Sequence, residues 1–260
     1  MAGQVRIEKD GVLGWIVFDH QARRNAITAE MWAAIPPAAA ALDADPDVRV
    51  VVMRGAGETA FVAGADISEF EQMRTGDNAA DYERRNAEAF LALARMEKPL
   101  LAMIHGFCVG GGVAIALNAD MRYAADDARF AVPAARLGLG YSAAGIETLA
   151  RLVGDSYAKE IFFTARRFDA EEALRMGLVN AVVAKGDLEA RVKATALQIA
   201  ENAPLTVRSV KLAVRESQKS HASRDVDAVT QAIQRCYDSD DYREGVSAFL
   251  EKRPPKFRGR

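Results

Sequence analysis

A glycine-rich turn is encoded by His105-Gly106-Phe107-Cys108-Val109-Gly110-Gly111-Gly112-Val113-Ala114. Apolar residues 100–104 precede it and apolar residues 114–119 follow, so the pattern predicts a strand, a tight turn and the start of a helix. Three adjacent glycines place no side chain over the backbone N–H groups of the turn. Because a helix N-terminus attracts negative charge, the turn suits an oxyanion or a phosphate. A plain connector without a ligand is the third interpretation.

A second turn of the same kind lies upstream, in Phe61-Val62-Ala63-Gly64-Ala65-Asp66-Ile67. It follows the apolar run 50–54 and again passes from a predicted strand through small residues into a predicted helix. Together the two turns resemble those of the crotonase superfamily, the enoyl-CoA hydratases and isomerases. The resemblance continues in order through residues 120–125, 129–133, 137–139, 151–154, 170–179 and 244–253, and so covers essentially the whole chain.

The resemblance implies an α/β fold, a right-handed spiral of ββα turns with a C-terminal helical trimerisation region. We therefore expect an acyl-CoA-binding core over residues 1–195 and an oligomerisation region over residues 196–260. Apolar side chains recur at helical spacing in the second region, at Val226, Val229 and Ile233, and need a surface to cover. The superfamily forms trimers, often dimers of trimers, so a homotrimer or hexamer is expected.

In the superfamily, two backbone N–H groups bind the thioester carbonyl oxygen of an acyl-CoA substrate. By position these oxyanion-hole groups fall on Ala65 and Gly111. The resemblance also implies a set of substrate-binding residues, which lie in the two turns and in the segment after a predicted N-terminal hairpin. These positions are Arg23, Ala26, Ala63, Asp66, Ile67 and Gly110. CoA is part of the substrate, so no separate cofactor is expected.

Secondary structure outside the turns follows from turn and breaker residues. Residues 5–7 and 14–19 predict the hairpin. Thr28 offers an N-cap for a helix, which Pro36-Pro37 should kink or restart. Further on, two separate helices are predicted over residues 142–153 and 156–164.

The composition narrows the class of protein. Half of the 260 residues are apolar, which is enough for one large core, and the formal net charge of −2 gives no basis for nucleic-acid binding. No apolar run approaches the roughly 18 residues that span a membrane, so we expect a soluble, cytoplasmic protein without a membrane partner. Cys108 and Cys236 lack metal-type spacing, so two reduced thiols and no metal are expected.

Two positions depart from the hydratases of the superfamily. Those enzymes carry one glutamate two residues after the three glycines and a second one after Phe-x-x-Pro. Here the corresponding residues are Ala114 and Ala134. Alanine moves no proton, and loss of a general acid or base typically costs roughly 10² to 10⁴ in rate. An oxyanion hole without these carboxylates suits a reaction that forms an enolate without removing a C–H proton, such as loss of CO₂ from a malonyl-type thioester.

A tyrosine supports the decarboxylation hypothesis. Residues 137–142 place Tyr141 where methylmalonyl-CoA decarboxylases of the superfamily have a tyrosine. The C-terminal residues 237–253 are also similar to the end of those decarboxylases. A phenol can hydrogen-bond the departing carboxylate and orient it for cleavage of the C–C bond.

Other side chains offer alternatives to the missing pair. Glu147 lies among Gly145, Ile146 and Leu149, so we expect burial to raise its pKa and make it the best replacement acid. Weaker candidates, each more simply explained as structural or surface residues, are Glu69, Glu71, His105 and Cys108.

Three hypotheses follow from these residues. The first is an acyl-CoA decarboxylase that uses Tyr141 and the Ala65 and Gly111 N–H groups. The second is an enoyl-CoA hydratase or isomerase that uses a nonstandard acid, with Glu147 preferred. The third is an acyl-CoA-binding protein that has lost catalysis.

Overall fold

The structure is a computed structural model that describes residues 2–69 and 78–260. A six-stranded sheet has the order β1-β2-β3-β5-β7-β10, with β1 antiparallel to β2 and the other neighbours parallel. Its strands are Gln4–Asp10, Leu13–Asp19, Val50–Gly55, Leu100–Ile104, Met121–Ala125 and Ala181–Val183. The hairpin predicted at the N-terminus is the β1–β2 pair, and its turn contains Gly11 with a φ of 57°.

A four-stranded sheet has the order β4-β6-β8-β9, with only β9 antiparallel to its neighbour. Its strands are Ala60–Val62, Phe107–Val109, Arg129–Ala131 and Phe168–Asp169. The chain alternates between the two sheets, so that β3–β4, β5–β6 and β7–β8 are successive strand pairs and each pair leads into a helical segment. This is the predicted spiral of ββα turns.

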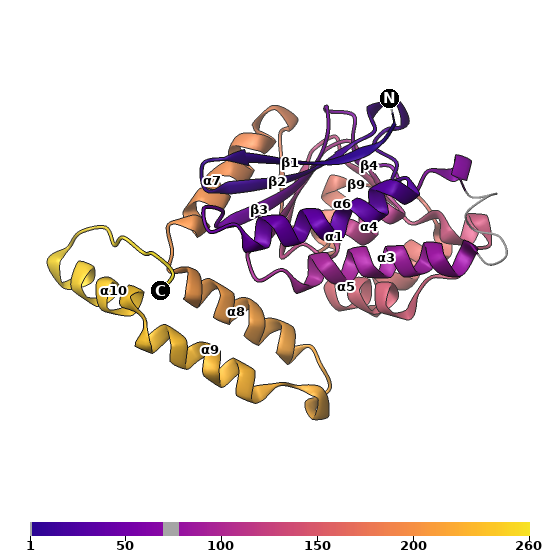
Figure 1. Cartoon of the computed structure of the whole chain (residues 1–260). Helices are drawn as coiled ribbons and strands as arrows, with labels where there is room; N and C mark the ends of the chain where they lie inside the picture. Colours follow the sequence, from indigo (N-terminus) through magenta and orange to yellow (C-terminus); the bar gives the residue numbers. More distant parts are fainter. Residues whose placement is uncertain (1, 70–77) are drawn as a thin grey trace.

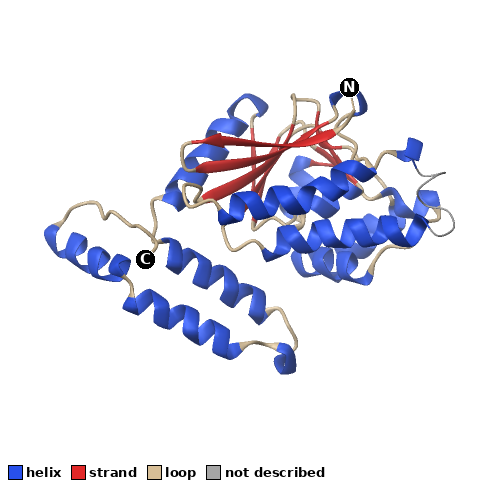
Figure 2. Ribbon diagram, viewed as in Figure 1, coloured by secondary structure: helices blue, strands red, loops and turns tan. Residues whose placement is uncertain are grey.

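Helices surround the sheets, as Figures 1 and 2 show. In the spiral they are α1 (Ala29–Ala44), α3 (Asn78–Arg95), α4 (Gly111–Ala116), α5 (Ala143–Thr164), α6 (Ala170–Arg175) and α7 (Leu188–Ala200). The 3-10 helices are η1 (Gln21–Arg23), η2 (Ile67–Glu69), η3 (Pro133–Leu137), η4 (Lys185–Asp187) and η5 (His221–Ser223).

The inner strands β2, β3 and β5 of the six-stranded sheet are buried on both faces, because a different group of core residues packs against each face. In β3, Val51 and Met53 join the main core with residues of α1 and of the four-stranded sheet. Val50 and Val52 point the other way and pack with residues of α7. The main core therefore lies between the two sheets and under α1, where the two glycine turns also lie.

Two helix breakers behave differently from each other. The helix does not restart at Pro36 and Pro37 as the sequence allowed, because α1 continues through both prolines to Ala44. Buried side chains on either side of them, including Ile35, anchor that helix to the core. The break predicted in α5 is present, because Gly154 has a φ of 78° within the segment.

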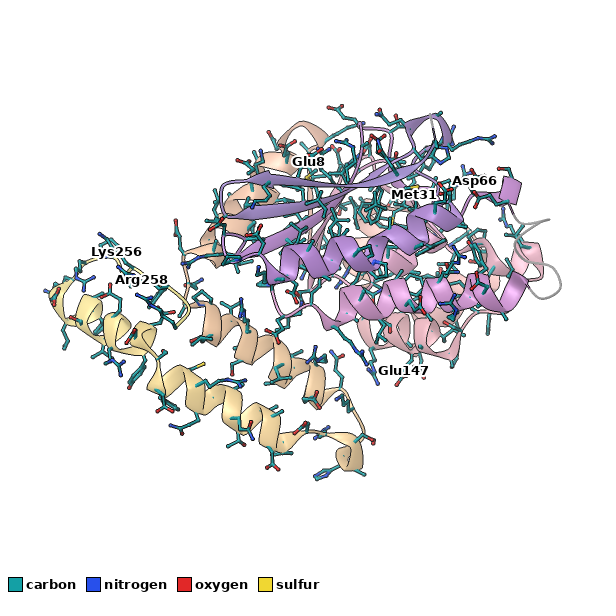
Figure 3. All side chains as sticks on the ribbon, viewed as in Figure 1. Glu8, Met31, Asp66, Glu147, Lys256 and Arg258 are labelled. Carbon is teal, nitrogen blue, oxygen red and sulfur yellow. The ribbon has the colours of Figure 1, made fainter. Side chains whose placement is uncertain are left out.

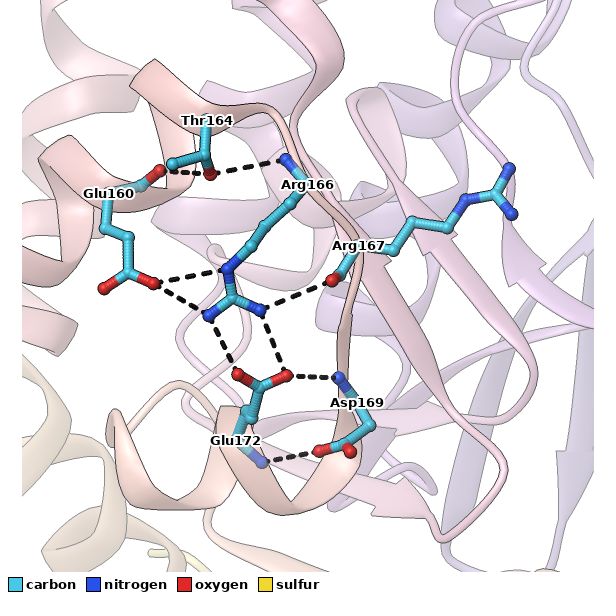
Figure 4. Close-up of polar contacts among 6 residues, drawn as sticks. All are labelled: Glu160, Thr164, Arg166, Arg167, Asp169 and Glu172. Atoms are coloured by element: carbon cyan, nitrogen blue, oxygen red, sulfur yellow. Dashed lines mark hydrogen bonds and ion pairs between the residues drawn. The ribbon is translucent and has the colours of Figure 1, made fainter.

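Arg166 joins α5 to α6 at the edge of the spiral (Figure 4). Its guanidinium donates to Glu160 of α5 at 2.8 Å and makes a two-pronged contact with Glu172 of α6. These carboxylates raise the pKa of Arg166 above its usual value. Glu172 also closes a capping box with Asp169 at the start of α6. The cluster fixes how β9 enters the four-stranded sheet.

The last three helices extend away from the spiral in Figure 1. They are α8 (Pro204–Ser217), α9 (Val226–Asp238) and α10 (Asp240–Glu251). The boundary predicted after residue 195 falls within α7, and the chain changes direction between α7 and α8. Large apolar side chains lie exposed on these helices, and Phe249 is 84% exposed. In the part of the chain that the structure describes, no helix has the length and apolar character needed to cross a membrane.

Candidate active site

The three glycines connect β6 to α4 and bring that helix close to β4. Gly110 has a φ of 50°, donates to Ala131 O at 2.8 Å and accepts from Ala114 N at 3.0 Å. A Cβ atom at position 112 would lie 2.1 Å from the Val62 carbonyl oxygen, so only glycine fits there. Gly111 is the first residue of α4, where a backbone N–H has no partner within the helix.

The second turn holds Ala65 against the segment that precedes α1. Ile27 donates to Gly64 O at 2.8 Å and accepts from Asp66 N at 2.9 Å. These two hydrogen bonds form a parallel bridge between Ile27 and Ala65. In such a bridge the middle residue directs its own N–H to the opposite side. The Ala65 N–H therefore points away from Ile27.

The two residues that carry the predicted donors lie close together. A Cβ atom at position 111 would lie 3.6 Å from Ala65 N and 3.3 Å from Cζ2 of the buried Trp32. Among the described residues, no protein acceptor takes the N–H of Ala65 or of Gly111. Two unpaired N–H groups around one space can hold a single oxygen atom that carries negative charge.

The two alanines that stand at the family's glutamate positions are both buried. Ala114 of α4 and Ala134 of η3 are each 8% exposed, and Ala134 belongs to the main hydrophobic core. Their methyl groups offer no proton donor or acceptor. The start of η3 lies beside the glycine turn, since Pro133 Cδ would be 3.9 Å from a Cβ atom at position 110.

Tyr141 lies after η3 and packs into the wall of the spiral. Its ring meets that of Phe162 edge-on, with the centroids 4.9 Å apart. Gly145 leaves room for the ring, because a Cβ atom there would lie 3.0 Å from Tyr141 Cε1. The ring is half-buried against the main core. The predicted role of its hydroxyl in holding a carboxylate stays a prediction.

The burial predicted for Glu147 is wrong. Its side chain is 62% exposed and forms an ion pair with Arg151 one turn further along α5. Ile146, which was expected to help bury it, is itself exposed. In Figure 3, Glu147 projects from the edge of the molecule, on a different side from Asp66. Without burial, the argument for Glu147 as the replacement acid is lost.

The acids after Ala65 have structural partners. Glu69 accepts a hydrogen bond from Ala29 N at 2.8 Å, at the first residue of α1. Asp66 is buried and accepts from both Ser68 N and Ser68 Oγ. Burial acts to raise the pKa of Asp66, but the Ser68 hydrogen bonds and nearby positive charges outweigh it and hold that pKa below its usual value. Glu71 lies outside the described residues.

The other predicted substrate-binding positions divide between surface and interior. Arg23 is exposed, whereas Ala26 is buried and its carbonyl accepts from His20 Nδ1 at 2.9 Å. Ala63 is half-buried and donates to Arg24 O at 3.1 Å. Ile67 opens η2.

Asn25 is a residue that the sequence analysis missed. It is buried and has a φ of 57°, a conformation that asparagine tolerates better than most residues. Its position between Arg24 and Ala26, before a helix N-cap at Thr28, was the only available signal.

His105 and Cys108 are both buried, and burial shifts the pKa of each side chain in the direction that favours its neutral form. It lowers the pKa of His105, and Nε2 of that ring has no hydrogen-bond partner among the described residues. It raises the pKa of the Cys108 thiol well above its usual value, which keeps the sulfur protonated. In the same part of the chain, no group of three or more His, Cys, Asp or Glu side chains could hold a metal ion.

Comparison with known proteins shows the family to which the chain belongs. The family model for enoyl-CoA hydratase/isomerase matches residues 8–260. A short-chain-enoyl-CoA hydratase of Clostridium acetobutylicum is 34% identical, over 96% of this chain and 95% of its own. A crotonyl-CoA hydratase of Syntrophomonas wolfei is 35% identical, over 96% of each chain. The crystal structure of an enoyl-CoA hydratase/isomerase family protein of Hyphomonas neptunium has a TM-score of 0.94 and 39% identity, covering 98% of each chain.

The two sheets, the spiral order and the paired turns thus define an α/β protein of the crotonase fold. The chain belongs to the enoyl-CoA hydratase/isomerase family. Both curated relatives carry hydratase names, so they support the hydratase hypothesis rather than the finer resemblance to decarboxylases.

Proposed function

We propose that this protein binds a short-chain acyl-CoA thioester and stabilises its enolate between the N–H groups of Ala65 and Gly111. The observation that carries the proposal is the closeness of the two turns, since a Cβ atom on Gly111 would lie 3.6 Å from Ala65 N and both N–H groups lack a protein acceptor among the described residues. Hydrogen bonds from preorganised backbone donors strengthen as the carbonyl oxygen gains charge, which lowers the barrier to enolate formation. The names of the two curated relatives support a short acyl chain.

Hydration or isomerisation of an enoyl thioester is the reaction that the relatives favour. In hydration, the oxygen of water adds to C3 and gives up one proton, the electron pair of the double bond moves into the thioester enolate, and C2 then takes up one proton. The residues at Ala114 and Ala134 transfer none of these protons. Exposed Glu147 gives no better route, so the proton transfers in this scheme pass through solvent.

Decarboxylation of a malonyl-type thioester is a second candidate, and the alanines at positions 114 and 134 favour it. The bond between C2 and the carboxylate breaks, CO₂ leaves, and the electron pair forms the same enolate. A proton from water completes the product, so no protein base is needed. The Tyr141 hydroxyl would orient the carboxylate before the bond breaks.

Substrate binding and assembly complete the proposal. Around the hole, the CoA portion would contact the substrate-binding positions that the family resemblance indicates. These positions are Arg23, Ala26, Ala63, Asp66, Ile67 and Gly110. The exposed apolar faces of α9 and α10 would be covered by further copies of the chain, in a homotrimer or a hexamer.

Mass spectrometry of a mixed acyl-CoA panel tests the proposal. The panel contains crotonyl-, malonyl-, methylmalonyl- and ethylmalonyl-CoA, and a Gly111→Ala protein is the matched control. Addition of water to crotonyl-CoA by the wild-type protein alone would establish the hydratase, and loss of CO₂ from a malonyl-type member would establish the decarboxylase. Saturable binding with no turnover of any member would contradict catalysis and favour the acyl-CoA-binding protein.

A further inference from the structure

Asn25 is a buried amide whose hydrogen-bonding groups all contact backbone. Its side chain is 1% exposed. Nδ2 donates to Ala56 O at 3.0 Å and to Ala60 O at 2.8 Å, and Oδ1 accepts from His20 N at 3.0 Å. Buried amide groups are costly to leave unpaired, so these three bonds hold the side chain in one orientation. The amide thereby ties the segment before α1 to the start of β4.

The surrounding backbone is shaped around this amide. A Cβ atom at position 55, the end of β3, would lie 2.6 Å from Asn25 Nδ2 and 2.1 Å from Ala60 O. Glycine at position 55 therefore leaves the space in which the amide meets the Ala60 carbonyl. The left-handed backbone of Asn25 points the side chain into that space.

The same segment holds the Ala65 donor by backbone hydrogen bonds. Ala63 donates to Arg24 O at 3.1 Å, just before Asn25. Just after it, Ile27 forms the parallel bridge with Ala65 that directs the Ala65 N–H away from Ile27. Asn25 thus lies between the two attachments and is itself bonded to Ala60, five residues before the donor.

We propose that Asn25 is a positioning residue for the Ala65 oxyanion donor. Its amide fixes the distance between the segment before α1 and β4, and through the Ile27 bridge it sets the direction of the Ala65 N–H. The inference rests on the proposed oxyanion hole, and it assigns Asn25 no contact with substrate. Loss of the amide leaves the Ala65 N–H present but misaligned, so stabilisation of an enolate falls more than substrate binding does.

Asn25→Gly is the informative substitution, because glycine keeps the left-handed backbone without strain and removes only the amide. Asn180→Gly is the matched control, since Asn180 Oδ1 accepts from Arg122 N at 2.8 Å at the β7 side of the six-stranded sheet. The probe is acetoacetyl-CoA, which loses a C2 proton to solvent to give an enolate with its own near-ultraviolet absorption. Titration yields both the dissociation constant and the enolate absorbance at saturation.

We expect the wild-type and Asn180→Gly proteins to show the enolate band. In Asn25→Gly, the enolate absorbance at saturation should be about tenfold lower than in the wild-type protein, while the dissociation constant should stay within about threefold of the wild-type value. An undiminished band in Asn25→Gly would overturn the positioning role while leaving the oxyanion hole intact. A wild-type protein that binds acetoacetyl-CoA without any enolate band would instead contradict the proposed function. If Asn25→Gly does not fold, Asn25→Asp keeps the bond from His20, removes both donated bonds, and is judged by the same outcomes.

Discussion

The glycine turns and the two alanine positions lie in the same interior but differ in what they can contribute. On the turn side, Gly111 lies close to Ala65, and the N–H groups of both residues have no protein acceptor among the described residues. On the other side, Ala114 and Ala134 place methyl groups where family hydratases carry carboxylates. The turns therefore offer backbone donors for the proposed oxyanion hole, whereas the side chains at positions 114 and 134 transfer no proton.

The contrast teaches that these two parts of a catalytic site depend on different features of the chain. The donors are fixed by backbone conformation, by the close contact of Gly112 with Val62, and by the Ile27 bridge. Most of these features also hold α4 and β4 together, so the fold needs them. A carboxylate at position 114 or 134 would have no such structural role, and alanine is accommodated in the interior at both positions.

Placing a methyl group beside the two backbone donors is expected to have the largest effect on activity. In Gly111→Ala, the new methyl group enters the space between the two N–H groups and lies 3.3 Å from Trp32 Cζ2. We expect kcat/KM on the substrate identified by the panel to fall by roughly 10² to 10³. Gly186→Ala is the control, because a Cβ atom there meets nothing within 4 Å. Equal activity in the two variants would contradict the role of the Ala65 and Gly111 N–H groups in catalysis.

Introducing the two family glutamates is expected to have the next largest effect on activity. The double substitution Ala114→Glu with Ala134→Glu supplies the carboxylates of the family hydratases. We expect crotonyl-CoA hydration to rise by about 10², at some cost in stability because both positions are buried. The single variants, which supply one carboxylate each, are the comparison. If wild-type protein already hydrates crotonyl-CoA as fast as the double variant, the alanines are not the reason for a slow reaction.

Tyr141 tests whether an aromatic hydroxyl compensates for the absent acids. Tyr141→Phe keeps the ring against Phe162 and removes only the oxygen. We expect about a tenfold loss of malonyl-type decarboxylation, with the melting temperature little changed. Steady-state kinetics on the malonyl-type members of the panel provide the measurement. Full decarboxylase activity in the phenylalanine variant would assign the tyrosine a packing role alone.

Glu147 gives the smallest expected effect. Because this carboxylate is exposed and paired with Arg151, Glu147→Gln should change kcat/KM by less than about twofold on any panel substrate. Arg151→Gln, which removes the other half of the ion pair, should behave alike. A decrease in kcat/KM of about tenfold or more in Glu147→Gln, but not in Arg151→Gln, would indicate that Glu147 takes part in catalysis.

Local sequence patterns were sufficient for much of the fold. The two strand–turn–helix units, the N-terminal hairpin and the break at Gly154 were predicted from apolar runs and glycines, which act over a few residues. The continuous path of α1 through Pro36 was not, because tertiary packing of Ile35 and its neighbours outweighs the local breaker.

The site was only partly predictable for a related reason. Backbone donors follow from turn positions, so Ala65 and Gly111 could be named from the family resemblance. The burial of Glu147 was wrongly predicted from its apolar neighbours in the sequence. Such neighbours do not reveal whether another helix or strand covers that face of α5, and the Glu147 side chain is exposed. Asn25 was missed because its partners, Ala56 and Ala60, lie more than 30 residues away and use carbonyl groups that every residue has.

Difference infrared spectroscopy of bound crotonyl-CoA, labelled with ¹³C at the thioester carbonyl, tests the oxyanion hole directly. We expect the carbonyl stretch to move to lower frequency on binding to the wild-type protein, because two N–H donors polarise the C=O bond. In Gly111→Ala that shift should be lost while binding remains measurable. A bound carbonyl with its solution frequency in the wild-type protein, or an equal shift in both proteins, would contradict the assignment of Ala65 and Gly111.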